Sequence, residues 1–252
     1  MSVDMNLSIV TFNIKGLKPR NYDYLQILFH KFDFLLIQET WLFDFEYENI
    51  SKILPKSSFI GKSAMNENEI GRLGRPFGGC MILYKNSCLL PVSQVHTNSA
   101  RLCGATIVTK SFRILLISLY MPCDENTNNS ASDYIDVLNE MSALFNTYDG
   151  FKIIVGGDFN VDFVRNSFNT KLLIDFMDSE SLININSVFK NNEYTFESYN
   201  GSRSLVDYFM ITENGKNNVL SYEVLDDGLN MSDHRPIVIK LNFSHSNAVE
   251  KF

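Results

Sequence analysis

The sequence predicts a layered α/β or α+β sandwich in which two β-sheets pack face to face and helices cover their outer faces. Strand-like apolar segments outnumber helical ones, and the helices are interleaved with hairpins along the chain. No internal repeat, low-complexity tract or interior linker divides the 252 residues, although length alone also fits two small domains. With 45% hydrophobic and 20% charged residues, the composition is that of an ordinary globular protein with a large core.

Strands and helices alternate in the first half of the chain. Apolar, β-branched segments predict strands at residues 7–14, 34–38, 80–84, 101–109 and 112–120, the last two joined as a hairpin. Near-helical spacing of apolar residues predicts helices at residues 22–32 and 46–54, and Pro55 ends the second of them. Residues 61–79 have the composition of a polar loop.

The second half continues this alternation. Helices are predicted at residues 134–145 and 169–177, and a polar loop precedes the first of them, with Ser130 or Ser132 as its N-cap. Strands are predicted from residue 152 and at residues 182–185, 205–211, 219–225 and 237–243. The segment 191–204 is predicted to be a loop.

Residues 152–160, Lys-Ile-Ile-Val-Gly-Gly-Asp-Phe-Asn, are the segment around which we expect a functional site. Four strand-forming residues lead into two glycines, which let backbone or ligand approach closely because they carry no Cβ. The spacing places Asp158 and Asn160 on the same side of an extended chain, where an acid and an amide face one ligand. Taken alone, the segment is equally consistent with a strand that ends in an Asx turn.

Other polar residues lie at the ends of other predicted strands. Ser232-Asp233-His234 precedes the last strand, and Asn13 and Glu39 end the first two. Taken singly, Asn13 is also consistent with a turn cap, and a solvated loop residue is the favoured interpretation of Glu39. Asp207 lies inside an apolar strand, where a carboxylate is costly unless it is paired, hydrogen-bonded or close to a cation. Hard oxygen ligands for Mg²⁺, together with an imidazole that titrates near neutrality, suit metal-assisted phosphoester hydrolysis.

The charge and cysteine content restrict the partners and the compartment. A formal net charge of −7 is the wrong sign for binding nucleic acid by bulk electrostatics, so DNA contact requires a local basic patch or a divalent metal. Arg72 and Arg75 give the loop at 61–79 such a positive end, although solubility explains them equally well. The four cysteines show no zinc spacing, and neither a signal peptide nor a membrane span is present, so we expect a soluble intracellular protein with reduced thiols.

Six motifs, in this order along the chain, resemble those of the endonuclease/exonuclease/phosphatase (DNase I-like) superfamily. They are Phe12-Asn13, Gln38-Glu39-Thr40, Leu119-Tyr120-Met121-Pro122, Gly156-Gly157-Asp158-Phe159-Asn160, Asp207-Tyr208 and Ser232-Asp233-His234. Each is weak alone, but the ordered set is specific and covers residues 7–243. The resemblance implies a four-layered αββα sandwich, with two mixed sheets and a site at one end of both, as a single domain over residues 1–243 followed by a flexible tail at 244–252.

Within the superfamily, three segments look most like the apurinic-type endonuclease domain of non-LTR (LINE-like) retrotransposons: residues 74–79, 194–196 and 204–208. There the domain nicks target DNA, and the element's reverse transcriptase primes on the freed 3′ hydroxyl. Cellular abasic-site endonucleases usually carry Trp-Arg before Leu-Asp-Tyr, whereas this chain has Arg203-Ser204-Leu205-Val206. The Trp-Cys-Asp-Arg segment of inositol-polyphosphate phosphatases is absent, and so is a reverse-transcriptase region. The resemblance thus implies an excised domain or a stand-alone relative that acts on DNA with nuclear access.

The resemblance also implies roles around the metal and the phosphate. Glu39 would bind Mg²⁺, with Mn²⁺ as an alternative, and Asn13 and Asp233 would lie close to the metal. Asp158 would orient or deprotonate the attacking water, and Asn160 and Tyr120 would hydrogen-bond the phosphate.

Two further groups have implied roles beside the phosphate. Asp207 would hold His234 in one tautomer and favour its protonated form; whether Asp158 or His234 is the general base stays open. Four residues would contact DNA through its backbone rather than its base edges: Thr195, Ser204, Arg75 and Arg203.

Two alternatives to a DNA-nicking enzyme stay open from the sequence. One is a phosphoesterase of the same fold that acts on abasic DNA, RNA, an inositol phosphate or a lipid headgroup. The other is a catalytically dead nucleic-acid-binding relative. Plasmid nicking compared with hydrolysis of small phosphoesters, with and without Mg²⁺, distinguishes the three.

Overall fold

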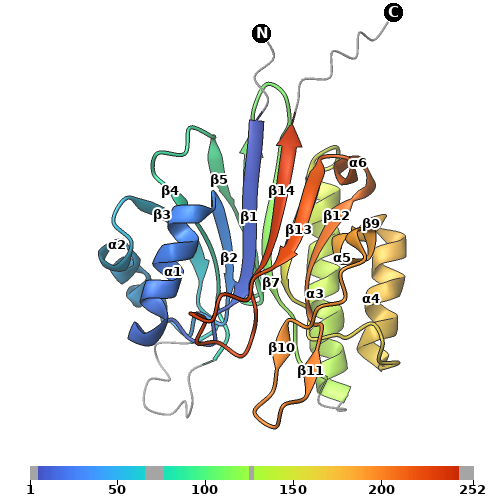
Figure 1. The fold of residues 1–252 in the computed structure, drawn as a ribbon. Coiled ribbons are helices and arrows are strands. Elements are labelled where there is room, and N and C mark those ends of the chain that lie inside the picture. Colours follow the sequence, from blue (N-terminus) through green and yellow to red (C-terminus); the bar gives the residue numbers. More distant parts are fainter. Residues whose placement is uncertain (1–4, 66–76, 125–127, 244–252) are drawn as a thin grey trace, which may run out of the picture.

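Two β-sheets packed face to face form the centre of the molecule (Figure 1). The structure, a computed structural model, describes residues 5–65, 77–124 and 128–243. In spatial order, the first six-stranded sheet consists of β13 (Val219–Val224), β14 (Ile237–Phe243), β1 (Met5–Asn13), β2 (Phe34–Gln38), β4 (Cys80–Lys85) and β3 (Ser57–Lys62). The second consists of β5 (Val92–Val95), β6 (Leu102–Val108), β7 (Arg113–Tyr120), β8 (Lys152–Asp158), β12 (Asp207–Thr212) and β9 (Leu182–Asn184).

Both sheets are mixed, and each contains one parallel pair of strands. β1 pairs with β2 in parallel, and β7 pairs with β8 in parallel, whereas the other pairings are antiparallel. A parallel pair needs a crossover connection, and α1 (Pro19–Lys31) and α3 (Asn128–Thr147) supply the two crossovers. The strands of each parallel pair end at the same edge of their sheet, which is the lower edge in Figure 1.

Helices form the two outer layers. α1 packs on the outer face of the first sheet, and α3 and α4 (Phe168–Ser179) pack on the outer face of the second. Four short helices complete the set in the described ranges: η1 (Asp44–Asn49), α2 (Ile50–Ile53), α5 (Ile185–Phe189) and α6 (Glu213–Lys216). The predicted αββα sandwich is therefore confirmed.

Strand periodicity divides the apolar residues between an inner and two outer cores. In β1, Leu7 and Ile9 face the other sheet, whereas Val10 and Phe12 face α1. In β8, Ile154 belongs to the inner core and its neighbours pack against α3. Because both sheets bury both faces, their central strands are continuous apolar runs, which is the pattern the sequence showed.

Gly156 allows the two sheets to approach closely at the centre of this core. A Cβ at this position would lie 2.6 Å from a ring carbon of Phe209 and 2.7 Å from Leu36 Cδ1 on the opposite sheet. At Gly157 it would lie 1.9 Å from the carbonyl oxygen of Leu119 on the adjacent strand. The paired glycines thus serve the packing of sheets and strands, in place of the ligand approach that the sequence also allowed.

The structure corrects several predicted elements. The strands β3 and β5 were not predicted, and part of the predicted loop 191–204 forms a two-stranded hairpin, β10 (Phe196–Glu197) with β11 (Arg203–Ser204). α3 already begins at Asn128, so Ser130 and Ser132 lie inside the helix and neither is its N-cap. Asp207 is the first residue of β12 and not an interior one. The tail predicted at 244–252 lies outside the described residues.

Candidate active site

Four polar side chains lie at the ends of four central strands, on the inner faces of the two sheets. Asn13 of β1 is the register partner of Gln38 of β2, and Asp158 of β8 is the register partner of Asp207 of β12. All four are at most 1% exposed. The same period of two that directs Ile9 and Ile154 into the inner core directs these polar ends toward one another, which places the predicted residues in one site.

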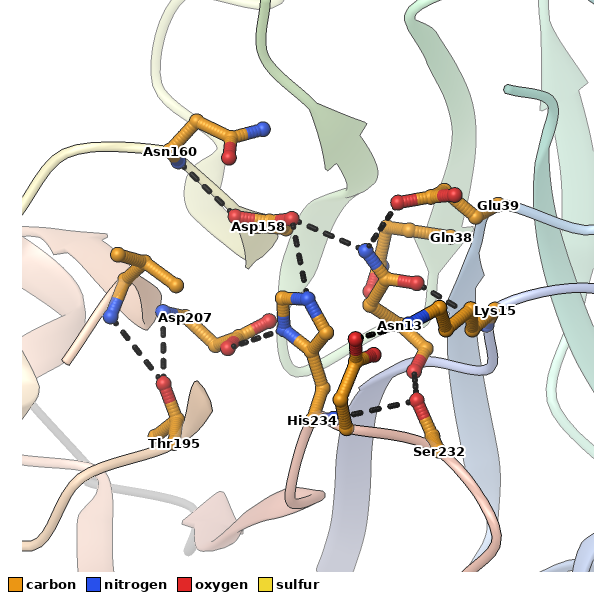
Figure 2. A network of polar contacts seen from close by, with 12 residues as sticks. Asn13, Lys15, Gln38, Glu39, Asp158, Asn160, Thr195, Asp207, Ser232 and His234 are labelled. Atoms are coloured by element: carbon orange, nitrogen blue, oxygen red, sulfur yellow. Dashed lines mark hydrogen bonds and ion pairs between the residues drawn. The ribbon is translucent and has the colours of Figure 1, made fainter. Parts of the chain in front are cut away.

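His234 lies between two carboxylates (Figure 2). Its Nδ1 donates a hydrogen bond of 2.9 Å to Oδ2 of Asp207, and its Nε2 lies 3.9 Å from Oδ2 of Asp158. The imidazole is 6% exposed, so little water screens these charges. The three groups form a buried acid–base chain that ends at Asp158.

The buried chain shifts the pKa of two of its members upward. For Asp158, burial and then the negative charge of Asp207 raise the carboxyl pKa to about 7, against the opposing effect of His234. For His234, burial lowers the pKa, but the charges of Asp207 and then Asp158 outweigh it and raise the value to about 9. Near neutral pH the imidazole is therefore protonated, and Asp158 exchanges its proton within the physiological range.

Asn13 connects this chain to Glu39 on the first sheet. Its Nδ2 donates to Oε1 of Glu39 at 2.9 Å and to Oδ2 of Asp158 at 3.0 Å. The second carboxylate oxygen of Glu39 accepts a hydrogen bond of 2.9 Å from the indole Nε1 of Trp41. One carboxamide thus fixes two carboxylates from opposite sheets beside each other, as Figure 2 shows.

The side chains present fit a hard divalent cation at Glu39. An ionised carboxylate offers about four lone-pair sites, and on Glu39 the hydrogen bonds from Asn13 and Trp41 use two of them. Within the described ranges, Asp158, Asp207 and His234 also form a group that could enclose a metal. That group fits Mg²⁺ poorly, because a protonated imidazole has no lone pair to give and Mg²⁺ prefers oxygen ligands. Glu39, partly exposed and next to Asp158, is the better position.

Two residues predicted to be near the metal or phosphate are engaged elsewhere. Asp233 forms an ion pair with the ammonium group of Lys15, so its charge is already balanced. The Nδ2 of Asn160 donates to the carbonyl of Met121 at 2.8 Å, while its backbone N–H donates to Asp158 Oδ1 at 2.9 Å. Asn160 thus orients Asp158 through its main chain.

Tyr120 lies at the edge of the site as the register partner of Asp158. Its ring is half-buried, and the guanidinium of Arg101 lies 5.1 Å from the ring centroid. Burial, then the charge of Glu39, raises the pKa of its phenol far above the ordinary value, so the hydroxyl stays protonated and can donate a hydrogen bond.

The structure places the four predicted DNA contacts differently from one another. Thr195 is fully buried, and its Oγ1 accepts hydrogen bonds of 3.1 Å from the backbone N–H groups of Val206 and Asp207. A buried hydroxyl cannot touch DNA, so that prediction is wrong for Thr195, which positions Asp207 instead. Arg203 is exposed on β11, where it pairs with Glu197 at 3.0 Å, and Ser204 is partly exposed beside it. Arg75 lies outside the described residues.

Three contributors were not predicted as site residues. Lys15 and Trp41 contact Asp233 and Glu39, and Ser232 donates to the carbonyl of Asn13 at 2.7 Å. Ser232 stood inside a recognised motif, and Trp41 is the single tryptophan, two residues after Glu39. These two positions in the sequence could have identified Ser232 and Trp41 as site residues. No sequence pattern indicated the ion pair of Lys15 with Asp233, because the two residues are 218 positions apart.

Comparison with protein families gives a match over about half of the chain. A family model described as "Endonuclease-reverse transcriptase" matches residues 114–238, which include Tyr120, Asp158, Asp207 and His234. The chain belongs to the endonuclease/exonuclease/phosphatase superfamily. The nucleases of this DNase I-like superfamily depend on a divalent cation.

Solved structures of the superfamily share the fold at low sequence identity. An AP endonuclease from Leishmania major is 18% identical, with a TM-score of 0.76 over 94% of this chain and 87% of that one. The endonuclease domain of TRAS1, a telomere-specific non-LTR retrotransposon, is 17% identical, with a TM-score of 0.72 over 95% and 99%. A 3′ phosphatase from Neisseria bound to product DNA hairpin is 15% identical, with a TM-score of 0.69 over 93% and 99%.

No curated protein matches the chain in sequence. Across the described ranges, none of the helices combines the length and the apolar character needed to cross a bilayer.

Proposed function

We propose that this chain is a Mg²⁺-dependent endonuclease that nicks DNA and leaves a 3′ hydroxyl. The observation that carries the proposal is the buried chain Asp207–His234–Asp158, joined through Asn13 to Glu39 at the open edge of both sheets. It combines a base with a pKa near neutrality, a cationic hydrogen-bond donor and an oxygen ligand for a metal in one place. Metal-assisted hydrolysis of a phosphodiester uses these three functions.

Each residue has a distinct role in the proposed reaction. Asp158 accepts the proton of the attacking water, and a base with a pKa of about 7 is well matched to that task at neutral pH. His234 stays protonated through its bond to Asp207 and donates to the phosphate oxygen on which charge develops. Tyr120 donates its phenolic hydrogen to another phosphate oxygen.

Glu39 would hold a divalent cation at this edge, where the cation would add positive charge to that of His234. Bound at Glu39, a divalent cation would neutralise the scissile phosphate and the leaving 3′ oxygen. Asn13 holds Glu39 and Asp158 close together, because its amide group donates hydrogen bonds to both carboxylates. With a net charge of −7, the chain gains most of its attraction for DNA from the bound cation and from local basic residues.

We infer further that the nicked DNA is the target site of a non-LTR retrotransposon. Support comes from the matched family model, whose description joins an endonuclease to a reverse transcriptase, and from the fold shared with the TRAS1 endonuclease domain. Such an enzyme acts with a reverse transcriptase and reaches chromosomal DNA in the nucleus.

A plasmid assay tests the proposal. Supercoiled plasmid is incubated with the chain in Mg²⁺ or in EDTA, alongside an abasic-site oligonucleotide, an RNA and small phosphoesters. We expect nicked circles in Mg²⁺ only, with ends that a DNA polymerase extends without prior phosphatase treatment, since a 3′ phosphate would block extension. Preferential cleavage of the abasic oligonucleotide or of a small phosphoester would instead assign the site to a different substrate of the same fold.

Conservative variants test whether the activity depends on this site. Asp158→Asn and His234→Gln should each lose at least about 100-fold in rate, the usual minimum for a positioned acid or base, while retaining a cooperative melt. Asp175→Asn is the control, because Asp175 is an exposed carboxylate on α4. Full activity in either site variant, or nicking that persists in EDTA, would contradict the assignment.

A further inference from the structure

We propose that Trp41 is a positioning residue for the Glu39 carboxylate, and that this single tryptophan senses a divalent cation bound there. The inference rests on the proposed function in one respect only, which is that Glu39 is the metal ligand. The new element is Trp41, whose indole N–H donates to the same carboxylate that would bind the ion.

The backbone turn at Glu39 brings the Trp41 side chain close to the Glu39 carboxylate. Glu39 has φ of 51° and Trp41 has φ of 57°, a left-handed conformation that is uncommon outside glycine. Because both residues prefer negative φ, two positive φ values in one turn must be stabilised by the surrounding structure. Gly16 N–H donates to the carbonyl of Glu39 at 2.8 Å, and Trp41 N–H donates to the carbonyl of Gly78 at 3.0 Å. The turn is held from both sides.

The indole ring is fixed as firmly as the backbone. A Cβ at Gly16, whose φ is +91°, would lie 2.2 Å from a carbon of the Trp41 ring, so only glycine permits this close stacking. The ammonium group of Lys18 lies 4.8 Å from the ring centroid, a favourable cation–π distance. Trp41 is 9% exposed. Its Nε1–H therefore points at Glu39 with little rotational freedom.

The two hydrogen bonds to Glu39 divide the carboxylate between two donors. Oε1 accepts from Asn13 and Oε2 accepts from Trp41, each at 2.9 Å. A glutamate has three rotatable side-chain bonds, and ordering it on cation binding costs conformational entropy. Because both oxygens are already fixed, much of that cost is met during folding, and the carboxylate is preorganised for the cation.

Loss of the indole N–H should therefore weaken the metal site without removing a ligand. Partners that orient a metal ligand typically change metal affinity about 10- to 100-fold when mutated. Trp41→Phe keeps a ring against Gly16 and below Lys18 but removes the donor. We expect the Mg²⁺ concentration at half-saturation to rise by about 10- to 100-fold.

Because of the same contact, the fluorescence of Trp41 should change when a cation binds at Glu39. Indole emission responds to charge near the ring, and a cation at Glu39 neutralises the charge that faces Nε1. With one tryptophan in the sequence, the signal has a single source. Titration of the full chain with MgCl₂ in the absence of DNA should change the emission with a saturating curve, and Glu39→Gln should abolish the change.

Affinities of variants are measured by the rise in Tm with MgCl₂, since a ligand that binds the folded state stabilises it by mass action. Tyr47→Phe is the matched control, because it also removes one ring donor next to this turn. The Tyr47 hydroxyl lies 3.0 Å from Thr40 Oγ1 and donates to the carbonyl of Cys80, rather than contacting Glu39. We expect Tyr47→Phe to lower the Tm and leave the Mg²⁺ midpoint unchanged, whereas Trp41→Phe moves the midpoint.

The outcomes separate this inference from the proposed function. A wild-type Mg²⁺ midpoint in Trp41→Phe, or flat emission in a chain whose Tm rises with MgCl₂, overturns the positioning role while Mg²⁺-dependent nicking stands. If Trp41→Phe fails to fold, the emission titration of the wild-type chain and of Glu39→Gln still decides. A wild-type Tm that responds to neither Mg²⁺ nor Mn²⁺ overturns both proposals.

Discussion

Asp207 should determine the pH at which His234 loses its proton, and Asp207→Asn tests this. The substitution keeps the size of the side chain and removes one negative charge 2.9 Å from Nδ1. In the native chain the charges of Asp207 and Asp158 outweigh the opposing effect of burial and raise the pKa of His234 from 6.5 to about 9. That rise is equivalent to about 3 kcal/mol, since one pKa unit is about 1.4 kcal/mol.

Without Asp207, burial and Asp158 oppose each other, and the pKa of His234 should return to its ordinary value of about 6.5 or below. At pH 8 the protonated fraction then falls from most of the molecules to a few per cent, so the nicking rate should drop about 30-fold. The stability contribution has a definite sign. A raised imidazole pKa stabilises the fold fully below 6.5, and this contribution is lost as pH rises through about 9.

Two measurements check the prediction. The initial rate of plasmid nicking is recorded across a pH range that brackets 6.5 and 9, and the imidazole signals of the four histidines are followed by NMR, with His234→Gln providing the assignment. Asp226→Asn is the control, because Asp226 is an exposed acid that pairs at 2.7 Å with Arg235, the residue after His234. An alkaline limb that stays near pH 9 in Asp207→Asn would refute the reasoning.

Three further predictions follow from other contacts. Thr195→Val removes the acceptor for two backbone N–H groups, of which that of Asp207 is buried. It should lower the free energy of unfolding in urea by about 1–3 kcal/mol and reduce kcat more than KM; a change in KM alone would restore Thr195 as a DNA contact. Gly156→Ala places a methyl group 2.6 Å from Phe209, and overpacking should cost about 1–3 kcal/mol in the same denaturation. Because burial raises the pKa of Asp158 to about 7, the nicking rate should rise with pH through 7; an acid limb near pH 4 would contradict this.

The central site was predictable because it is built from strand ends. Asn13, Asp158 and Asp207 each follow or begin an apolar run, and a period of two fixes which face of the sheet they share. His234 was recognisable from Ser232-Asp233-His234 and its place before β14. These signals are local, and packing of the two sheets then brings the strands together.

Other features depend on contacts that no local pattern contains. β3 is a strand because it pairs with β4 along six residues, although its own sequence, Ser-Ser-Phe-Ile-Gly-Lys, is only weakly strand-like. The hairpin of β10 and β11 is stabilised by the ion pair of Arg203 with Glu197 and by a backbone β-bridge between Phe196 and His234. Thr195 looked like an exposed hydroxyl in a polar loop, and only the fold shows that it accepts hydrogen bonds from two backbone N–H groups at the start of β12, those of Val206 and Asp207.

The positions that carry the chemistry are also the costly ones. Asp158 and Asp207 face each other as a register pair, both 1% exposed, and two such charges in a poorly solvated interior repel strongly. One protonated imidazole between them offsets that repulsion, and the apolar residues along the rest of the same strands stabilise the fold around the site. Each strand is therefore stabilising along most of its length and functional at its end. This division explains why isosteric changes at the strand ends should remove activity while the sandwich still folds.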